Sequence, residues 1–319
     1  MNNDDIQKNE ERLIHAAWLY YEVGLTQKQI ASRMRISRAT VGRMIQSAID
    51  AGIVKIKITK TLPKQLKIEE EMINKFDLSH ISIINEGTSF KSTRDMLAKS
   101  AADYLVSSLF PGCKLGLAWS NTLSLMIKYI PYQKVSENVS IHEIVGTFLD
   151  INTDFSIASR LAEKFDVPLE KLPVPVLVSN KNARDAILQE ESIIRALNNA
   201  AKVSLVFVGL GSIDQDSSLI KTNYIDISKI SELARRGAVG EVLFHFYDKN
   251  GKKIIAQELE ERTIGIKWPE FKNIENVVAV ASGTNKVKPI LGALRGKIIN
   301  GLITDVATAQ SVLTYSMDD

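Results

Sequence analysis

Apolar positions divide this chain into two regions with different periodicity. Up to about residue 76 they recur at the three- and four-residue spacing of amphipathic helices. From residue 77 onward, short continuous apolar runs alternate with helical segments, which is typical of an α/β domain with a largely parallel sheet. We therefore predict a helical domain over residues 1–60, a linker helix over 61–76 and an α/β domain over 77–319.

Residues 24–58 carry the pattern of a helix-turn-helix. Thr26 and Ser37 are suitable N-caps for two successive helices, because a hydroxyl oxygen accepts a hydrogen bond from a free backbone N–H. A tight turn over 35–36 separates the helices, and the second ends near Gly52. Their apolar positions are spaced to pack together, and these are Ile30, Ala31, Met34, Val41, Ile45 and Ile49.

Two flanking segments complete this picture. Residues 11–23 carry apolar positions in a helical pattern and would form a supporting helix. Residues 52–59 alternate apolar and basic side chains, which is consistent with a wing strand or hairpin.

Basic residues concentrate in the helix-turn-helix segment, although the net charge of the whole chain is only +3. Lysine and arginine there would neutralise phosphates and release counterions, which supplies most of the sequence-independent affinity for DNA. The N-terminal residues of the second helix are those that such motifs present to base edges in the major groove. The predicted DNA-binding residues are Thr26, Gln27, Lys28, Ser37, Arg38, Thr40 and Arg43. The alternative is a solvent-exposed helical hairpin with ordinary surface charge. The helix caps, the spacing of the apolar residues and the concentration of basic residues all favour the DNA-binding helix-turn-helix.

The second region predicts alternating strands and helices. The strand-like runs are 80–85, 114–119, 139–145, 174–178, 203–209, 241–247, 276–282 and 299–305. The helical patterns are 91–108, 121–130, 155–165, 185–200, 228–236, 286–296 and 306–315. Asn250 and Gly251 additionally indicate a hairpin turn.

Polar loops follow several of these predicted strands. In open parallel sheets, ligands bind at the loops beyond the carboxyl ends of the strands. Small residues and hydroxyls there expose backbone N–H groups that suit an anion, and Lys286 adds a positive charge. Glu241 follows a glycine-flanked turn and could accept hydrogen bonds from sugar hydroxyls. The predicted effector-binding residues are Ser120, Asn121, Thr122, Gly146, Thr147, Glu241 and Lys286.

Composition narrows the class of protein. A chain of 319 residues with 45% hydrophobic and 24% charged residues is ordinary for a globular protein. The single Cys113 excludes an intramolecular disulfide, and the four scattered histidines predict no metal site and no cofactor. The polar N-terminus and the lack of a run of about 18 apolar residues predict a cytoplasmic protein without a membrane partner.

Several motifs in combination resemble the SorC/DeoR-type sugar-binding transcriptional regulators, over about residues 12–313. They are KLGLAWSNTL, VSLVFVGLGSI, RRGAVGEVLFHFYDKNG and VVAVASGTNKVKPILGALRGKIINGLITD, together with residues 24–58. The resemblance implies a winged-helix-like DNA-binding domain joined to an effector domain with a sugar isomerase/CoA-transferase-like, Rossmann-like sheet. It also implies dimers or tetramers on double-stranded operator DNA, which a sugar or sugar phosphate would release or rearrange.

The same resemblance suggests roles for the candidate residues. Residues 120–122 would form the loop on the phosphate side, Glu241 would bind hydroxyls, and Lys286 would follow the glycine-rich turn. The chain departs from the family pattern at residues 142–148 and 118–121, where relatives often have more glycine. The effector is therefore expected to be either a sugar or a sugar phosphate.

These features predict a transcriptional regulator, with repression of a carbohydrate-uptake or catabolism operon as the expected role. One alternative is an enzyme related to sugar-phosphate isomerases or deaminases, with Glu241 and Lys286 as acid and base. A second alternative is an architectural DNA-binding protein whose C-terminal domain only oligomerises. Consumption of a sugar phosphate would support the former, and DNA binding without any ligand response would support the latter.

Overall fold

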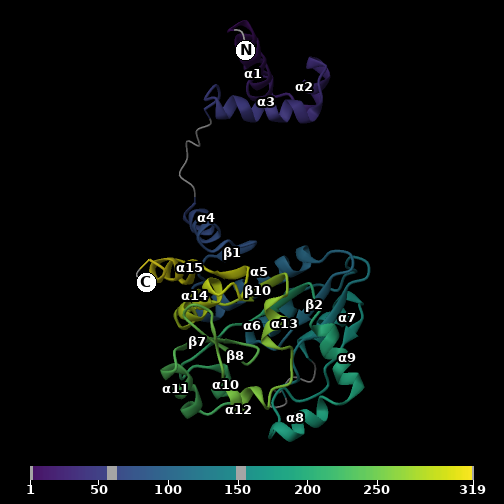
Figure 1. Ribbon diagram of the computed structural model, residues 1–319, viewed down its shortest axis with the longest axis vertical. Coiled ribbons are helices and arrows are strands. Elements are labelled where there is room, and N and C mark those ends of the chain that lie inside the picture. Colours follow the sequence, from purple (N-terminus) through teal and green to yellow (C-terminus); the bar gives the residue numbers. More distant parts are fainter. Residues whose placement is uncertain (1–2, 56–62, 149–155, 318–319) are drawn as a thin grey trace. The chain divides into compact units, whose positions relative to one another are not determined.

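The computed structural model describes residues 3–55, 63–148 and 156–317. The chain forms two compact units, Met1–Leu62 and Pro63–Asp319 (Figure 1). In the described ranges, no helix is both long and apolar enough to cross a membrane.

The first unit is a helix-turn-helix with a supporting helix. Its elements are α1 (Asn3–Tyr21), α2 (Gln27–Met34) and α3 (Arg38–Asp50). α2 ends at Arg35, whose left-handed backbone (φ 53°) turns the chain toward α3. Leu19, Ile30, Val41 and Ile45 pack into one core that joins the three helices. Of the predicted wing, residues 52–55 form a turn and a bend, and the remainder lies outside the described residues.

The second unit is built on a seven-stranded sheet in which every neighbouring pair is parallel. The strand order is β1-β11-β10-β5-β2-β3-β4. The parallel α/β fold expected from the alternating apolar runs is therefore confirmed. The strands are β1 (His80–Ile84), β2 (Lys114–Leu117), β3 (Ser140–Glu143), β4 (Leu169–Glu170), β5 (Leu205–Val208), β10 (Asn276–Val280) and β11 (Gly301–Asp305).

Helices cover both faces of this sheet. In β5, Leu205 and Phe207 pack on one side and Val206 and Val208 on the other, because successive strand residues point to opposite faces. The first face is covered by α5 (Phe90–Ser108), α6 (Asn121–Met126) and α7 (Ile157–Phe165). The second face is covered by α4 (Lys64–Phe76), α14 (Val287–Arg295) and α15 (Val306–Tyr315). Because both of its faces are buried, the central strand β5 is a continuous apolar run.

Helix α4, expected to be a linker, packs on the sheet of the second unit. Ile68 and Met72 are buried in its core. The Gln65 side chain donates a hydrogen bond to the carbonyl of Ile83 in the edge strand β1. The Ile83 N–H donates to Glu69 Oε1 at 3.2 Å. α4 thus satisfies backbone groups that β1 cannot pair with another strand.

A second sheet of four antiparallel strands is inserted between β5 and β10. Its strands are β6 (Gly211–Ser212), β7 (Ala238–Val242), β8 (His245–Asp248) and β9 (Lys253–Ile254). The prediction of one strand over 241–247 is wrong, because the chain reverses at Leu243 and Phe244 (φ 54° and 63°). Neither is a residue that normally marks such a turn, so the apolar run concealed it. The hairpin predicted at Asn250 and Gly251 is present between β8 and β9.

Two further predictions differ from the structure. Residues 174–178 make only isolated bridges, among them Thr147 with Pro175, and proline cannot donate to a sheet ladder. The helix predicted over 185–200 is two helices, α8 (Lys181–Ile187) and α9 (Glu191–Ala200). The remaining short elements are η1 (Ile127–Tyr129), α10 (Ser218–Lys221), α11 (Ile227–Arg235), α12 (Gln257–Glu260), α13 (Trp268–Lys272) and η2 (Thr284–Lys286).

Candidate functional site

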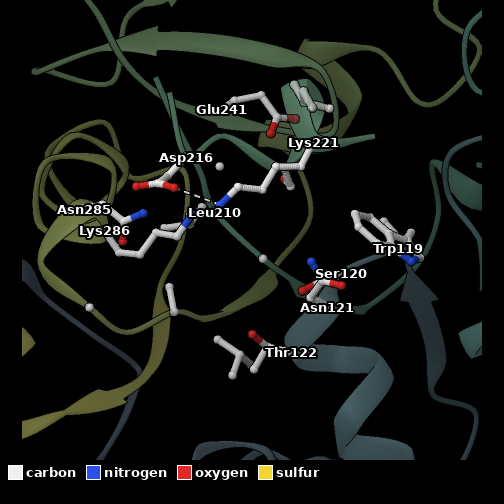
Figure 2. Close-up of a pocket in the computed structure, with 18 of the residues that line it drawn as sticks. Trp119, Ser120, Asn121, Thr122, Leu210, Asp216, Lys221, Glu241, Asn285 and Lys286 are labelled. Atoms are coloured by element: carbon white, nitrogen blue, oxygen red, sulfur yellow. Dashed lines mark hydrogen bonds and ion pairs between the residues drawn. The ribbon is translucent and has the colours of Figure 1, made fainter. Parts of the chain in front are cut away.

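A pocket of about 700 Å³ lies at the carboxyl ends of the central strands. Residues that follow β2, β5 and β10 line it, and the second sheet contributes Glu241 and the turn between β7 and β8. Figure 2 shows Glu241, Lys286 and Ser120 pointing into one space from different elements. This position is the one at which open parallel sheets bind ligands.

Two glycines make room for the pocket's polar side chains. A Cβ at Gly209 would lie 2.7 Å from Ser120 Oγ, which is too close for a real contact. A Cβ at Gly211 would overlap the carboxylate of Glu241. The glycine-rich loop after β5 therefore admits the Ser120 and Glu241 side chains, rather than acting as a dinucleotide-binding motif.

Glu241 is an acid held in a buried position. Its side chain lies on β7, and Oε1 accepts a hydrogen bond from the Phe244 N–H at 2.5 Å. Burial raises the pKa of its carboxyl to about 7, against the opposing effects of the Phe244 N–H and the charge of Lys286. Near neutral pH this group can therefore either accept a hydrogen bond from a hydroxyl or donate one.

Lys286 is a partly buried cation of the pocket. It ends η2, where its N–H donates to the carbonyl of Gly283 at 2.9 Å. Burial lowers the pKa of its ammonium group, while the carboxyls of Glu241 and Asp214 act in the opposite direction. A cation in this position suits an anionic or strongly polar ligand group.

A second lysine reaches the pocket as part of an ion pair. Lys221 Nζ lies 2.9 Å from Asp216 Oδ1, and this hydrogen bond lowers the pKa of the Asp216 carboxyl (Figure 2). The sequence reasoning missed both residues. They enter the pocket only because the second sheet folds back over the first, and no spacing in residues 214–221 indicates this.

The structure brings five of the seven predicted effector residues together. Ser120, Asn121, Thr122, Glu241 and Lys286 all line the 700 Å³ pocket. Gly146 and Thr147 instead line a neighbouring pocket of about 80 Å³. Their N–H groups donate to the carbonyls of Ile264 and Val174, at 3.0 and 2.7 Å.

Apolar and aromatic residues of the pocket also escaped the sequence reasoning. Trp119, Phe148 and Phe244 line the pocket, together with Phe90 and Arg94 from the start of α5. Trp119 directly precedes the predicted Ser120, so its place in the same loop was the available signal. Phe148 directly follows the predicted Thr147 and so carried the same kind of signal, whereas Phe244 carried none, since it resembles an ordinary core residue.

The predicted DNA-binding residues fall into two groups in the first unit. Lys28, Arg38 and Arg43 are exposed on α2 and α3. Thr26 and Ser37 cap these helices: Ser37 Oγ accepts from the Thr40 N–H at 3.0 Å and lies 2.8 Å from Thr40 Oγ1. Gln27 is partly buried, near Gly42. The hydroxyls thus contribute to helix structure, and the exposed cations are available to phosphates.

Comparison with known proteins assigns a family to each unit. The family described as "Putative sugar-binding domain" matches residues 60–314, which is most of the chain. The family described as "Homeodomain-like domain" matches residues 8–53, which contain the helix-turn-helix.

Individual relatives match along almost the whole chain. The transcriptional regulator YjhU of Escherichia coli K12 is 29% identical, covering 97% of this chain and 96% of its own. The transcriptional regulator LsrR of Enterobacter sp. strain 638 is 26% identical, covering 96% and 94%. The crystal structure of full-length SorC, the sorbitol operon regulator of Klebsiella pneumoniae, superposes with a TM-score of 0.74 at 24% identity, covering 96% and 99%.

Proposed function

Because the chain belongs to the SorC/DeoR-type sugar-binding transcriptional regulators, we propose that it represses a carbohydrate-uptake or catabolism operon until its effector binds. The observation that carries this proposal is the pairing of two sites in one chain. One is the basic face of the helix-turn-helix, and the other is a 700 Å³ pocket that holds Glu241 and Lys286. A sugar or sugar phosphate in the pocket binds one of two states of the protein more tightly than the other. Because the two states differ in DNA affinity, this preference changes how tightly the protein binds DNA.

Each site has an assigned set of residues in this proposal. Arg38, Arg43 and Lys28 contact phosphates and base edges of the operator, while Thr26, Gln27, Ser37 and Thr40 shape the two helix starts that approach the DNA. In the pocket, Glu241 binds hydroxyls and Lys286 binds a phosphate or a further hydroxyl. Ser120, Asn121 and Thr122 bind from the β2 side, and Gly146 and Thr147 shape the adjoining loop.

The proposal includes an assembly and a compartment. A homo-oligomer, either a dimer or a tetramer, would place two helix-turn-helix units on two half-sites of the DNA. The protein would work in the cytoplasm, where operator DNA and imported sugars meet.

The test is fluorescence anisotropy of the full chain on labelled DNA from its own upstream region. The DNA complex is titrated with a panel of free sugars and sugar phosphates. Tight binding that weakens with salt, and that one compound changes by about 5- to 150-fold, is the expected result. Tight binding that no compound alters would instead favour the architectural alternative.

Two variants separate the two sites. Lys286→Ala is expected to abolish the effector response and leave operator binding intact, whereas Lys288→Ala on the exposed side of α14 should behave as wild type. Arg38→Ala is expected to weaken operator binding by about 1–3 kcal/mol without changing effector affinity. A normal effector response in Lys286→Ala would refute the assigned pocket.

We further infer that the protein is not an enzyme. Incubation with each sugar phosphate of the panel should leave the compound unchanged by NMR. Turnover that Glu241→Gln removes would instead support the isomerase or deaminase alternative, with Glu241 as the proton-transferring group.

A further inference from the structure

One side of the pocket is an aromatic surface. The rings of Trp119 and Phe148 are 5.1 Å apart between centroids and inclined by 36°. Both side chains line the pocket and are partly exposed. They follow the neighbouring strands β2 and β3, so the parallel sheet places them side by side. A ligand in the pocket therefore meets the rings directly.

Further aromatic rings hold this surface in place from behind. Phe148 packs against Tyr224 at 5.0 Å and against Phe244 at 5.8 Å between ring centroids. Phe244 is 2% exposed and sits in the reversal between β7 and β8, at a φ of 63° that large side chains rarely adopt. The N–H of Phe244 also binds the Glu241 carboxylate. One turn thus fixes both the aromatic support and the acid.

The charged side chains of Lys286 and Asp216 lie away from Trp119 (Figure 2). In Figure 2, Lys286, Asn285 and Asp216 stand on one side of the pocket, and Trp119 stands on the other beside Ser120. The pocket therefore offers charges and amides to one part of a ligand and an apolar surface to another. A ligand that matches it must have an apolar face as well as polar substituents.

We propose that the effector is a ring-closed sugar, free or phosphorylated, whose C–H face lies on Trp119 and Phe148. A sugar ring in its chair form presents C–H bonds on a face, while its hydroxyls point outward to Glu241 and Lys286. An open-chain polyol has no such face, and it loses more conformational freedom on binding. This inference rests on the proposed function and specifies the substrate class of the same pocket.

Matched pairs of ligands test the requirement for a ring. Glucose, galactose, xylose and their terminal phosphates are compared with the alditols obtained by borohydride reduction, which keep the phosphate but cannot close. The chain has three tryptophans, so the Trp18→Phe/Trp268→Phe variant reports Trp119 alone by fluorescence. We expect at least one ring-closed sugar to change this fluorescence and to bind about tenfold or more tightly than its alditol.

Substitutions at Trp119 test the contact itself. Trp119→Leu keeps an apolar side chain without a ring. It should weaken binding of the ring-closed sugar by about three- to tenfold. The difference in affinity between that sugar and its alditol should therefore become smaller. Trp119→Phe should retain most of that advantage, and Trp268→Phe serves as the control. Unchanged operator affinity shows that each variant is folded. A merely structural role of Trp119 would weaken both ligands equally.

The possible outcomes separate the two proposals. Equal or tighter binding of the alditols would overturn the ring requirement and leave effector control intact. If no compound of either kind bound or changed operator affinity, effector control itself would fail, and the ring proposal with it.

Discussion

Glu241 shows how burial alone can set the chemistry of one residue. Its side chain is buried, and the hydrogen bond that Oε1 accepts from the Phe244 N–H at 2.5 Å compensates the charged form only in part. The pKa rises from an ordinary 4.5 to about 7 for this reason. Folding therefore binds a proton in the interval between these two values.

The sign of the pH dependence follows from this proton. Below pH 4.5 the group is protonated in both states and costs nothing, and its contribution to stability is lost as the pH rises toward about 7. Glu241→Gln should remove this loss. The free energy of unfolding, measured by urea denaturation, is compared for the variant and wild type. The difference in favour of the variant should increase by up to about 3 kcal/mol as the pH rises from about 5 to about 8. Exposed Glu71→Gln is the control, and parallel curves for wild type and Glu241→Gln would contradict the assignment.

At the same scale, the sequence predicts some pocket residues and not others. Glu241 and Lys286 lie next to glycine-rich loops, so their surroundings indicate a ligand site. Asp216 and Phe244 have no such surroundings, because an exposed acid and a large apolar residue are both common elsewhere in a chain. Their role depends on which strands become neighbours, and this is decided by packing over long sequence distances.

At the scale of elements, the helix starts of the first unit rest on two hydroxyl caps. Ser37→Ala removes the oxygen that accepts from the Thr40 N–H, and it should lower the free energy of unfolding by about 1 kcal/mol. Urea denaturation of the full chain followed by circular dichroism measures this. Ser47→Ala, on an exposed part of α3, is the matched control. Weaker operator binding at unchanged stability would show that Ser37 serves DNA rather than the helix.

Helix α15 is joined to the pocket by a buried hydroxyl. Thr308 Oγ1 accepts from the Gly283 N–H at 2.8 Å and donates to Asp305 Oδ2 at 2.8 Å, while Asp305 caps the helix. The loop that carries Lys286 is thereby tied to the start of a helix that packs against α4.

Thr308→Val keeps the shape of this side chain and removes its hydrogen bonds. We expect a loss of about 1–3 kcal/mol in the free energy of unfolding, because the Gly283 N–H and Asp305 Oδ2 lose their hydrogen-bond partner, while Asp305 Oδ1 still accepts from the backbone N–H of residue 308. Thr314→Val is the control, since its hydroxyl binds only the Gln310 carbonyl on an exposed turn. Equal stabilities of the two variants would mean that the loop is held by other contacts.

Helices and strands were predicted best where one pattern covers a whole element. The helix expected over 306–315 matches α15 at both ends, since strong apolar spacing follows the capping Asp305. The reversal at Leu243 and Phe244 was missed, because local sequence there favours a continuous strand and tertiary packing imposes a turn. The second sheet, and with it the turn that brings Leu243 and Phe244 into the pocket, was therefore not predictable from periodicity.

At the scale of the molecule, effector control requires that the two ligands act on each other equally. If a sugar lowers operator affinity by a given factor, operator DNA must lower sugar affinity by the same factor, which we expect to be about 5- to 150-fold. Calorimetric titration of the effector, with and without saturating operator, measures the second factor, and anisotropy measures the first. In Lys286→Ala both factors should fall to one. Unequal factors in wild type would indicate that effector and DNA are linked through a change in assembly.

The contact between α4 and β1 has a consequence for how copies of this chain can associate. An exposed edge strand is a template on which a strand of another molecule can add, and this leads to continuous intermolecular sheets or to aggregation. Here the Gln65 and Glu69 side chains occupy the outward backbone groups of Ile83, and the opposite edge is the two-residue strand β4. Neither edge of the seven-stranded sheet therefore favours the addition of a strand from another copy of the chain.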